Sequence, residues 1–245
     1  MRIINVHRLD TANVGDHASS PIKYFPIDAG RTDTFCRDRV GDADVVIVGG
    51  GGLLSEYFEP RLSRTLHDAR RIIVWGVGNH AYNGKPIEPA WLRRAELVGL
   101  RDWGGKYRWT PCASCMSPVF ERVPTPKHRF VVFRHHDVAN MPSFDAPTMH
   151  NYHTTLADAA AFLASGEFVV TNSYHGAYWA TLLGRRVVCR NWNPKFDGFK
   201  HPPTFLMDQR LSQALDQAVA YPDALEQCRT ANQAYYADVK RILDC

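Results

Sequence analysis

The sequence lacks long apolar runs. Hydrophobic residues make up 45% of the chain, but no stretch approaches the roughly 18 residues that cross a membrane. The first residues, MRIINV, also lack the apolar core of a secretory signal. We therefore expect a cytoplasmic protein, whose contact with the inner face of a membrane is at most peripheral.

Disulfide and metal patterns are also missing. The six cysteines do not show the spacing of a small disulfide-rich domain. Cys112 and Cys115 form a single C-x-x-C pair, and no second pair completes a zinc site. We interpret the cysteines as reduced thiols and expect no metal site.

Charge of either sign is modest and scattered. Lys and Arg total 29 against 25 Asp and Glu, which gives a net charge of +4. No Lys/Arg block is present, so we expect no nucleic-acid partner. A weakly basic protein suits an anionic small substrate.

What the sequence does contain is an alternation of short β-branched runs with helical stretches, which predicts an α/β fold with parallel sheets. Continuous apolar runs such as Val45–Val48 are typical of strands covered on both faces. The predicted strands are Ile3–Val6, Val45–Val48, Ile72–Trp75, Leu97–Leu100, Phe130–Phe133, Phe168–Val170 and Val187–Cys189. The predicted helices are Pro60–Ala69, Trp91–Glu96, Thr155–Ala164, Tyr174–Leu183, Asp208–Val219 and Asp223–Leu243.

A proline-rich stretch divides this pattern. Pro111, Pro118, Pro124 and Pro126 are interpreted as a linker region. We therefore expect two Rossmann-like halves, residues 1–125 and residues 126–245, the second including the closing helices. A ligand would occupy the cleft between them, outside the carboxyl ends of the strands.

Glycine-rich segments follow the first strands. Gly49–Gly52 come directly after Val45–Val48, where bare backbone N–H groups can approach an anion closely. No Gly-Lys-Ser/Thr follows, so the segment is not a P-loop. A tight packing turn is the alternative, but we favour ligand contact and name Gly50, Gly51 and Gly52 as binding candidates. The loop after the first strand adds Asn13 and Gly15.

The most informative segment begins where the strand Phe168–Val170 ends. Asn172 or Ser173 can cap the helix that follows. His175 then lies in the first turn, among free N–H groups at the positive end of the helix dipole, where an anion fits. A histidine that merely packs is the alternative. The strand-to-helix position favours a functional histidine, with Asn172 and Ser173 as neighbouring binding residues.

Three segments in order resemble the polysaccharide pyruvyl transferase family: Asn13–Asp16, Gly49–Gly52 and Val169–Gly176 with its Leu-Leu-Gly184 ending. The resemblance implies a two-domain GT-B-like fold with the site between the domains. It implies phosphoenolpyruvate as donor and a sugar of a cell-surface glycan, or its lipid-linked precursor, as acceptor. No further cofactor is expected. His175 matches the family's functional histidine.

One position departs from the family. Members usually carry Arg two residues before this histidine, where Ser173 stands here. An arginine there would grip a carboxylate or phosphate as a fork. Arg101 and Arg134, each after a predicted strand, are the candidates to replace it. A surface salt bridge is an equal alternative for both.

The remaining site predictions concern chemistry. We expect His175 to donate the proton to the donor's methylene carbon, and Asp16 to activate the sugar hydroxyl. His135, in a His-His-Asp run, is interpreted as binding an anion rather than a metal. Lys195, beside Trp192, suits phosphate, and a surface loop with packed aromatic residues is an equal alternative. Two alternatives stay open: a GT-B glycosyltransferase that uses a nucleotide sugar, and a non-catalytic glycan-binding relative.

Overall fold

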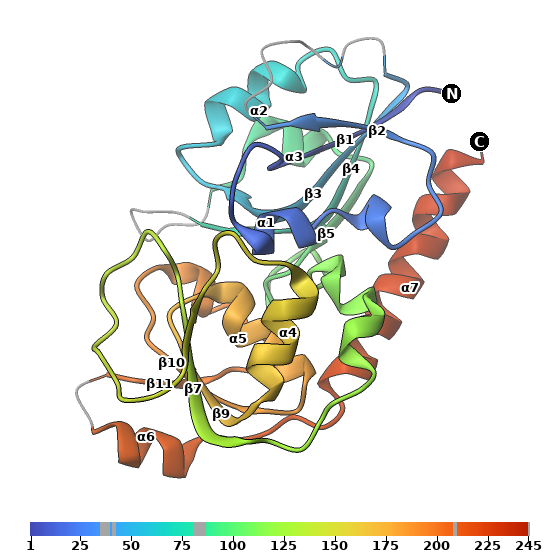
Figure 1. Cartoon of the computed structure of the whole chain (residues 1–245). Coiled ribbons are helices and arrows are strands. Elements are labelled where there is room, and N and C mark those ends of the chain that lie inside the picture. Colours follow the sequence, from blue (N-terminus) through green and yellow to red (C-terminus); the bar gives the residue numbers. More distant parts are fainter. Residues whose placement is uncertain (35–39, 41–42, 81–86, 208–209, 245) are drawn as a thin grey trace.

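The computed structural model of the chain describes residues 1–34, 40, 43–80, 87–207 and 210–244. It contains two parallel β-sheets, one above the other in Figure 1, each flanked by helices. The prediction of an α/β protein with two Rossmann-like halves is confirmed.

The first sheet has the strand order β2-β1-β3-β4-β5-β6, and every neighbouring pair is parallel. Its strands are β1 (Ile3–His7), β2 (Gly30–Asp33), β3 (Val45–Leu54), β4 (Arg71–Asn79), β5 (Leu97–Leu100) and β6 (Arg108–Trp109). Its helices are α1 (Val14–Ala18), α2 (Glu59–Thr65) and α3 (Ala90–Arg94). The order reverses between β1 and β3, which creates a topological switch point.

The second sheet repeats this plan. Its order is β11-β10-β9-β7-β8, again parallel, with the switch point between β7 and β9. Its strands are β7 (His128–Arg134), β8 (Thr148–His150), β9 (Gly166–Thr171), β10 (Arg186–Cys189) and β11 (Thr204–Phe205). Its helices are α4 (Leu156–Ala164), α5 (Tyr174–Leu182) and α6 (Leu211–Gln217).

Alternating residues of the central strands bury both faces of each sheet. In the first half, Val46 and Val74 pack with α2 and α3, while Val45 and Trp75 face the opposite side. In the second half, Val131 and Val169 pack with α4 and α5, and Val170 packs with α6. This burial on both faces explains why the strands are continuous apolar runs.

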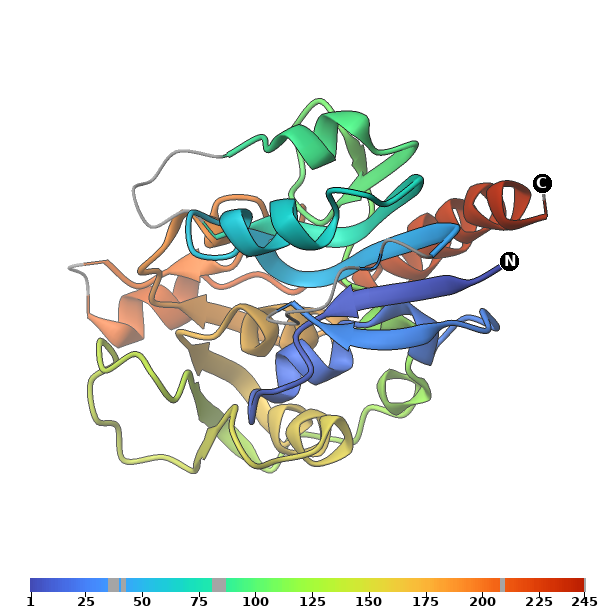
Figure 2. The ribbon, with the colours of Figure 1, turned by 90° about the horizontal axis from the view of Figure 1, so that it is seen from above.

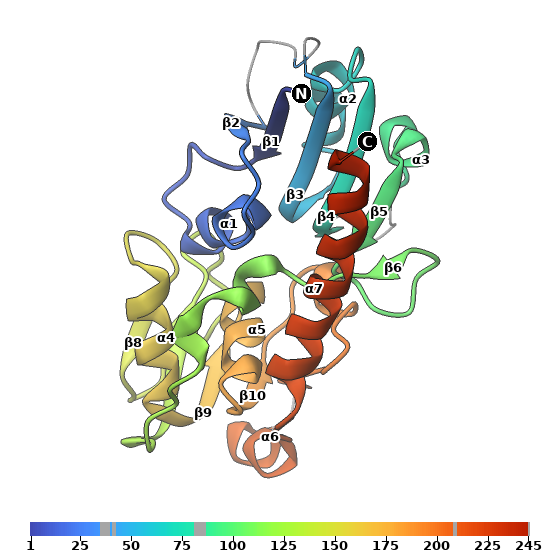
Figure 3. The same ribbon diagram turned by 90° about the vertical axis from the view of Figure 1, so that its right-hand side faces the viewer.

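The long helix α7 (Ala224–Leu243) ties the two halves together (Figure 3). Cys228 belongs to the core of the second half, whereas Tyr235 packs against Trp75 of the first sheet and donates to the carbonyl of Val74 at 2.6 Å. The helix thereby returns to the sheet where the chain began, and the two termini lie close together (Figure 2). The division of the chain at residue 125 stays a prediction.

The predicted strands and helices are present, with shifted ends. Thr155 caps α4 as its spacing to Asp158 predicts, and Gly184 ends α5 with φ +66°. Asp208, the predicted start of α6, lies outside the described residues. The proline-rich stretch is not a loose linker, because it forms 3₁₀ helices that bury Cys112, Cys115 and Phe120.

The glycine run differs from its prediction. Gly49–Gly52 lie inside β3 rather than in a turn, and Gly49 and Gly51 pair with Trp75 and Val77 of β4. A Cβ on Gly50 would lie 2.3 Å from the carbonyl oxygen of Ser19. Close packing of backbone, and not ligand contact, therefore accounts for glycine at this position.

Among the helices of the described ranges, none has the length and apolar character needed to cross a bilayer.

Candidate functional site

A cavity of about 440 Å³ opens between the two halves. Its walls come from segments that follow β1, β3, β4 and β5 in the first half, and β7, β8, β9 and β10 in the second. Both switch points contribute, as expected for a ligand site in this type of fold. The lining includes Asn13, Asp16, Gly52, His80, Arg101, His135, Tyr152, Ser173, Tyr174, His175, Trp192 and Lys195. This is the arrangement that the sequence analysis predicts as GT-B-like.

The start of α5 forms one wall. Ser173 is the N-cap, and its Oγ accepts from the backbone N–H of Gly176 at 3.3 Å. Gly176 allows α5 to pack closely against the end of β9, since a Cβ at this position would lie 2.5 Å from Thr171 Oγ1. The backbone amides of Tyr174 and His175 have no acceptor in the described part of the chain. They belong to the unsatisfied donors of a helix N-terminus, which favour an anion.

His175 is buried, with 7% of its surface exposed. Burial, followed by the nearby Arg101, Lys195 and His135, holds the pKa of its imidazole well below the usual 6.5. The ring is therefore neutral at neutral pH, and burial contributes most to this shift. Nε2 lies 3.6 Å from Cys112 Sγ, and Gly15 lies against Nδ1, where a Cβ would come within 2.1 Å.

Arg101 supplies a buried cation. Its side chain comes from the residue after β5, and only 3% of the residue is exposed. The guanidinium carbon lies 3.6 Å from the centre of the Tyr174 ring. Arg101 forms no salt bridge and no side-chain hydrogen bond among the described residues, and its Nε is buried without an acceptor. An unpaired buried cation beside a cavity is costly unless a ligand anion joins it.

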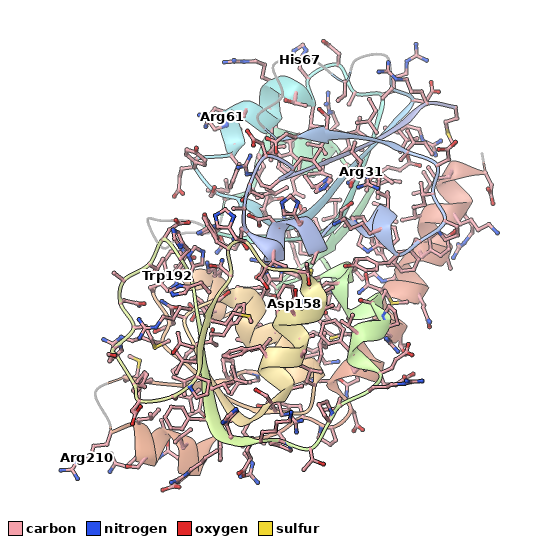
Figure 4. The ribbon with its side chains drawn as sticks, viewed as in Figure 1. Arg31, Arg61, His67, Asp158, Trp192 and Arg210 are labelled. Carbon is pink, nitrogen blue, oxygen red and sulfur yellow. The ribbon has the colours of Figure 1, made fainter. Side chains whose placement is uncertain are left out.

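Lys195 supplies a second buried cation, from the loop after β10. It is 4% exposed, and its Nζ lies 3.9 Å from the centre of the Trp192 ring. Burial and the charge of Arg101 lower the pKa of its ammonium from 10.5 to about 7. A lysine with this pKa is half charged at neutral pH and can both bind an anion and transfer a proton. Figure 4 shows the neighbouring Trp192 near the junction of the two halves.

Asp16, on α1, faces these cations from the first half. No hydrogen bond to its carboxylate is found within the described ranges. Burial raises the pKa of Asp16, while Arg8, Lys195 and Arg101 act in the opposite direction. A carboxylate with a raised pKa suits the role of a general base.

Within the His-His-Asp run, His135 and Asp137 line the cavity, whereas His136 does not. His135 lines the cavity, and burial and Lys195 lower its pKa to about 4. His136 instead stacks on Tyr152, with ring centres 4.5 Å apart. Asp137 accepts a hydrogen bond from the hydroxyl of Tyr152. In the part of the chain that the structure describes, no three His, Cys, Asp or Glu side chains gather as a metal site would require.

Several predicted binding residues do not line the cavity. Gly15 lies beneath the His175 ring, and Gly50 and Gly51 lie within β3. Asn172 instead joins the loops, because its side chain accepts from the amide of His135 and donates to Val138 and Asn140. Arg134 donates to the carbonyls of Met141 and Pro142, so Arg101 is the candidate that reaches the cavity.

Other lining residues were not predicted. Arg8, Tyr57 and Tyr152 enter the cavity from loops that carry no motif. Tyr174 stood in the recognised segment, but only the structure shows that its ring supports Arg101. A cation-to-aromatic contact between residues this far apart leaves no local signal in the sequence.

Comparison with known proteins adds independent evidence. No curated protein matches the sequence significantly. An uncharacterised protein of Klebsiella pneumoniae has a similar structure, with a TM-score of 0.56 and 15% identity, over 84% of this chain and 92% of that one. An α-glucosyltransferase in complex with UDP matches with a TM-score of 0.45 and 8% identity, over 96% of this chain and 95% of that one. At 15% identity, the similarity to the Klebsiella protein shows a shared fold and nothing further.

The decisive match is to a family model. The model described as polysaccharide pyruvyl transferase matches residues 4–194. This range includes β1 except its first residue, β2 to β10, and every cavity residue except Lys195. The chain therefore belongs to the polysaccharide pyruvyl transferase family.

Proposed function

We propose that this transferase moves the pyruvyl group of phosphoenolpyruvate onto two hydroxyls of one sugar and forms a cyclic ketal. The acceptor is a sugar of a cell-surface polysaccharide or of its lipid-linked precursor. No metal or further cofactor is part of the proposal. Family membership supports pyruvyl transfer to a polysaccharide, and the cavity supports the choice of donor.

The observation that carries the proposal is the pair of buried cations. Neither Arg101 nor Lys195 forms a salt bridge among the described residues, and both border the same cavity as the start of α5. Phosphoenolpyruvate carries a carboxylate and a phosphate ester on the same carbon atom. Two cations and free helix amides match these groups in charge, and the guanidinium matches either group as a fork.

The chemistry requires a proton donor, a base and stabilisation of negative charge. Protonation of the methylene carbon makes the neighbouring carbon an electrophile, and a sugar hydroxyl adds to it while losing its proton. Phosphate then leaves, and a second hydroxyl of the sugar closes the ketal. The sum is phosphoenolpyruvate plus a diol giving the ketal plus phosphate.

The cavity holds a candidate for each task. Arg101 and the α5 amides stabilise the anionic groups. Asp16, across the cavity, takes the proton of the attacking hydroxyl. His175 and Lys195 are the two groups that can bring a proton to the methylene carbon. Trp192 offers an aromatic face to the sugar.

Ligand-dependent thermal stability separates this proposal from the nucleotide-sugar alternative. We expect phosphoenolpyruvate to raise the unfolding temperature in a concentration-dependent manner, and nucleotide sugars to have no such effect. Stabilisation by a nucleotide sugar, without stabilisation by phosphoenolpyruvate, would support the glycosyltransferase alternative.

Turnover tests the remaining alternative of a non-catalytic relative. Phosphate release from phosphoenolpyruvate is measured with a panel of free and lipid-linked oligosaccharides, and products are identified by mass analysis. The proposal predicts release that depends on an acceptor and a product bearing one ketal. Binding of glycan without phosphate release across the panel would support a non-catalytic role.

A further inference from the structure

Behind His175 lies a buried chain of polar groups that the proposed function does not use. Nε2 of His175 is 3.6 Å from Cys112 Sγ, which is 3.1 Å from Ser114 Oγ. Ser114 Oγ in turn accepts from Trp179 Nε1 at 3.0 Å. Cys112, Ser114 and Trp179 are all fully buried. The C-x-x-C segment thus meets α5 directly beneath the candidate functional histidine.

The direction of these hydrogen bonds follows from the one fixed donor. The indole N–H of Trp179 can only donate, so Ser114 Oγ accepts there and has its own proton to place. The described residues offer that proton no other acceptor than Cys112 Sγ. With Sγ accepting from Ser114, the thiol proton is left to donate to Nε2. Buried donors are almost always satisfied, and only this direction satisfies all three.

The thiol is suited to remain a donor. Burial raises the pKa of Cys112 above its ordinary value, so the sulfur keeps its proton at neutral pH. If Nε2 accepts a hydrogen bond, the neutral imidazole carries its proton on Nδ1. Nδ1 has no hydrogen-bond partner in the described part of the chain, and it is not one of the fully buried unpaired atoms found there. Gly15 packs beside it, and a Cβ at that position would come within 2.1 Å. Since the ring lines the cavity, Nδ1 is the nitrogen available to a ligand.

We propose that Cys112 is a positioning residue whose thiol fixes His175 as a neutral imidazole with its Nδ1–H directed to the bound anion. His175 then stabilises the donor's negative charge through a hydrogen bond and transfers no proton. This inference rests on the proposed function for the identity of the anion. It leaves Lys195 as the group that protonates the methylene carbon.

The tautomer can be measured without any substrate. In the full-length protein with ¹⁵N-labelled histidine, long-range ¹H–¹⁵N correlation distinguishes protonated from bare ring nitrogens. The His175 signals are identified by their absence from H175N. We expect protonated Nδ1 and bare Nε2 near neutral pH. A bare Nδ1, or a ring protonated on both nitrogens, would overturn the inference whether or not the protein turns over phosphoenolpyruvate.

Variants of the thiol test its part in this arrangement. In C112A, Nε2 loses its donor, and we expect the His175 proton to be shared between the two nitrogens or to move to Nε2. C112S keeps a donor and should restore the wild-type tautomer. C189A removes another fully buried thiol, for which no hydrogen bond to His175 is found among the described residues, and serves as the matched control. An unchanged tautomer in C112A would show that Cys112 does not fix the tautomer of His175.

Activity provides the second arm. The amide nitrogen of asparagine occupies the place of Nδ1 and can donate, but it cannot carry a proton to carbon. We expect H175A to lower kcat about 100-fold, the typical loss of one donor to developing charge, and H175N to recover roughly tenfold of that loss. If H175N is no better than H175A, His175 does more than donate a hydrogen bond. If phosphoenolpyruvate is not a substrate while the tautomer is as expected, the proposed function fails and the positioning role stands.

Discussion

The guanidinium carbon of Arg101, from the first half of the chain, lies 3.6 Å from the centre of the Tyr174 ring at the start of α5 in the second half. This contact holds a buried cation at the start of α5, where the backbone amides of Tyr174 and His175 have no acceptor in the described part of the chain. Arg101 thereby supplies the guanidinium that the family motif usually carries at the position of Ser173. The charge is supplied by a different strand end, and the cavity exists only when the two halves are together.

Replacement of Arg101 tests this contact. Lysine at this position keeps one charge but loses the planar fork and the face-on contact with Tyr174. We expect R101K to weaken phosphoenolpyruvate binding by roughly 10- to 100-fold, as measured by calorimetry. R134K makes the same change at a guanidinium that bonds to loop carbonyls outside the cavity, and it should bind almost as the wild type does. Equal losses in both variants would contradict the assignment.

Binding of the donor should take up a proton. In the free protein the pKa of Lys195 is about 7, so part of the population is neutral at neutral pH. A bound multi-anion favours the charged ammonium and raises this pKa. Calorimetric titrations in buffers of different ionisation enthalpy measure the uptake. H175N should keep the uptake, because we assign the proton to Lys195, and K195M should abolish it.

Burial of Lys195 should also lower the free energy of unfolding. Its pKa falls from 10.5 in the unfolded chain to about 7 in the folded protein. Below pH 7 both states are charged, and the folded state bears the full cost of burying the ammonium. Between pH 7 and 10.5 the unfolded state binds the additional proton, so the free energy of unfolding rises with pH.

K195M removes this cost. We expect it to be more stable than the wild type by about 1–3 kcal/mol below pH 7, and this advantage should shrink towards pH 10.5. Denaturant titrations across this range provide the comparison. A K195M protein that is less stable than the wild type at low pH would show that the lysine is not buried with its charge.

The glycines of β3 should matter for packing. A Cβ on Gly50 would lie 2.3 Å from the carbonyl oxygen of Ser19, and backbone cannot move away easily. We expect G50A to lose about 1–3 kcal/mol of stability. Gly105 has open space around its Cβ position, so G105A is the matched control and should be nearly neutral. Wild-type stability in G50A, with loss of donor binding alone, would restore the ligand-contact interpretation.

Local signals in the sequence predicted those features that depend on neighbouring residues. The caps at Thr155 and Ser173 and the strand at Val45–Val48 are decided within one turn or one run. The placement of His175 at a helix start followed from the same kind of signal. Asp16, Lys195 and His135 also reach the cavity, because each follows a strand of a parallel sheet.

Features that depend on tertiary contacts were not predictable. Ser19 leaves no room for a Cβ on Gly50, and Trp75 leaves none for a Cβ on Gly49. These contacts explain glycine within a strand, whereas the glycine run by itself predicts a loop. Arg101 and Arg134 both follow strands, and only the surrounding loops decide which one faces the cavity. The thiol of Cys112 lies 63 positions from His175, and nothing near either residue indicates that they meet.

A crystal structure of the protein grown with phosphoenolpyruvate would test the central claim most directly. The account predicts the donor in the cavity between the halves, with its carboxylate or phosphate against Arg101, Lys195 and the first amides of α5. A donor bound elsewhere, or a cavity that accepts a nucleotide sugar and excludes phosphoenolpyruvate, would contradict it.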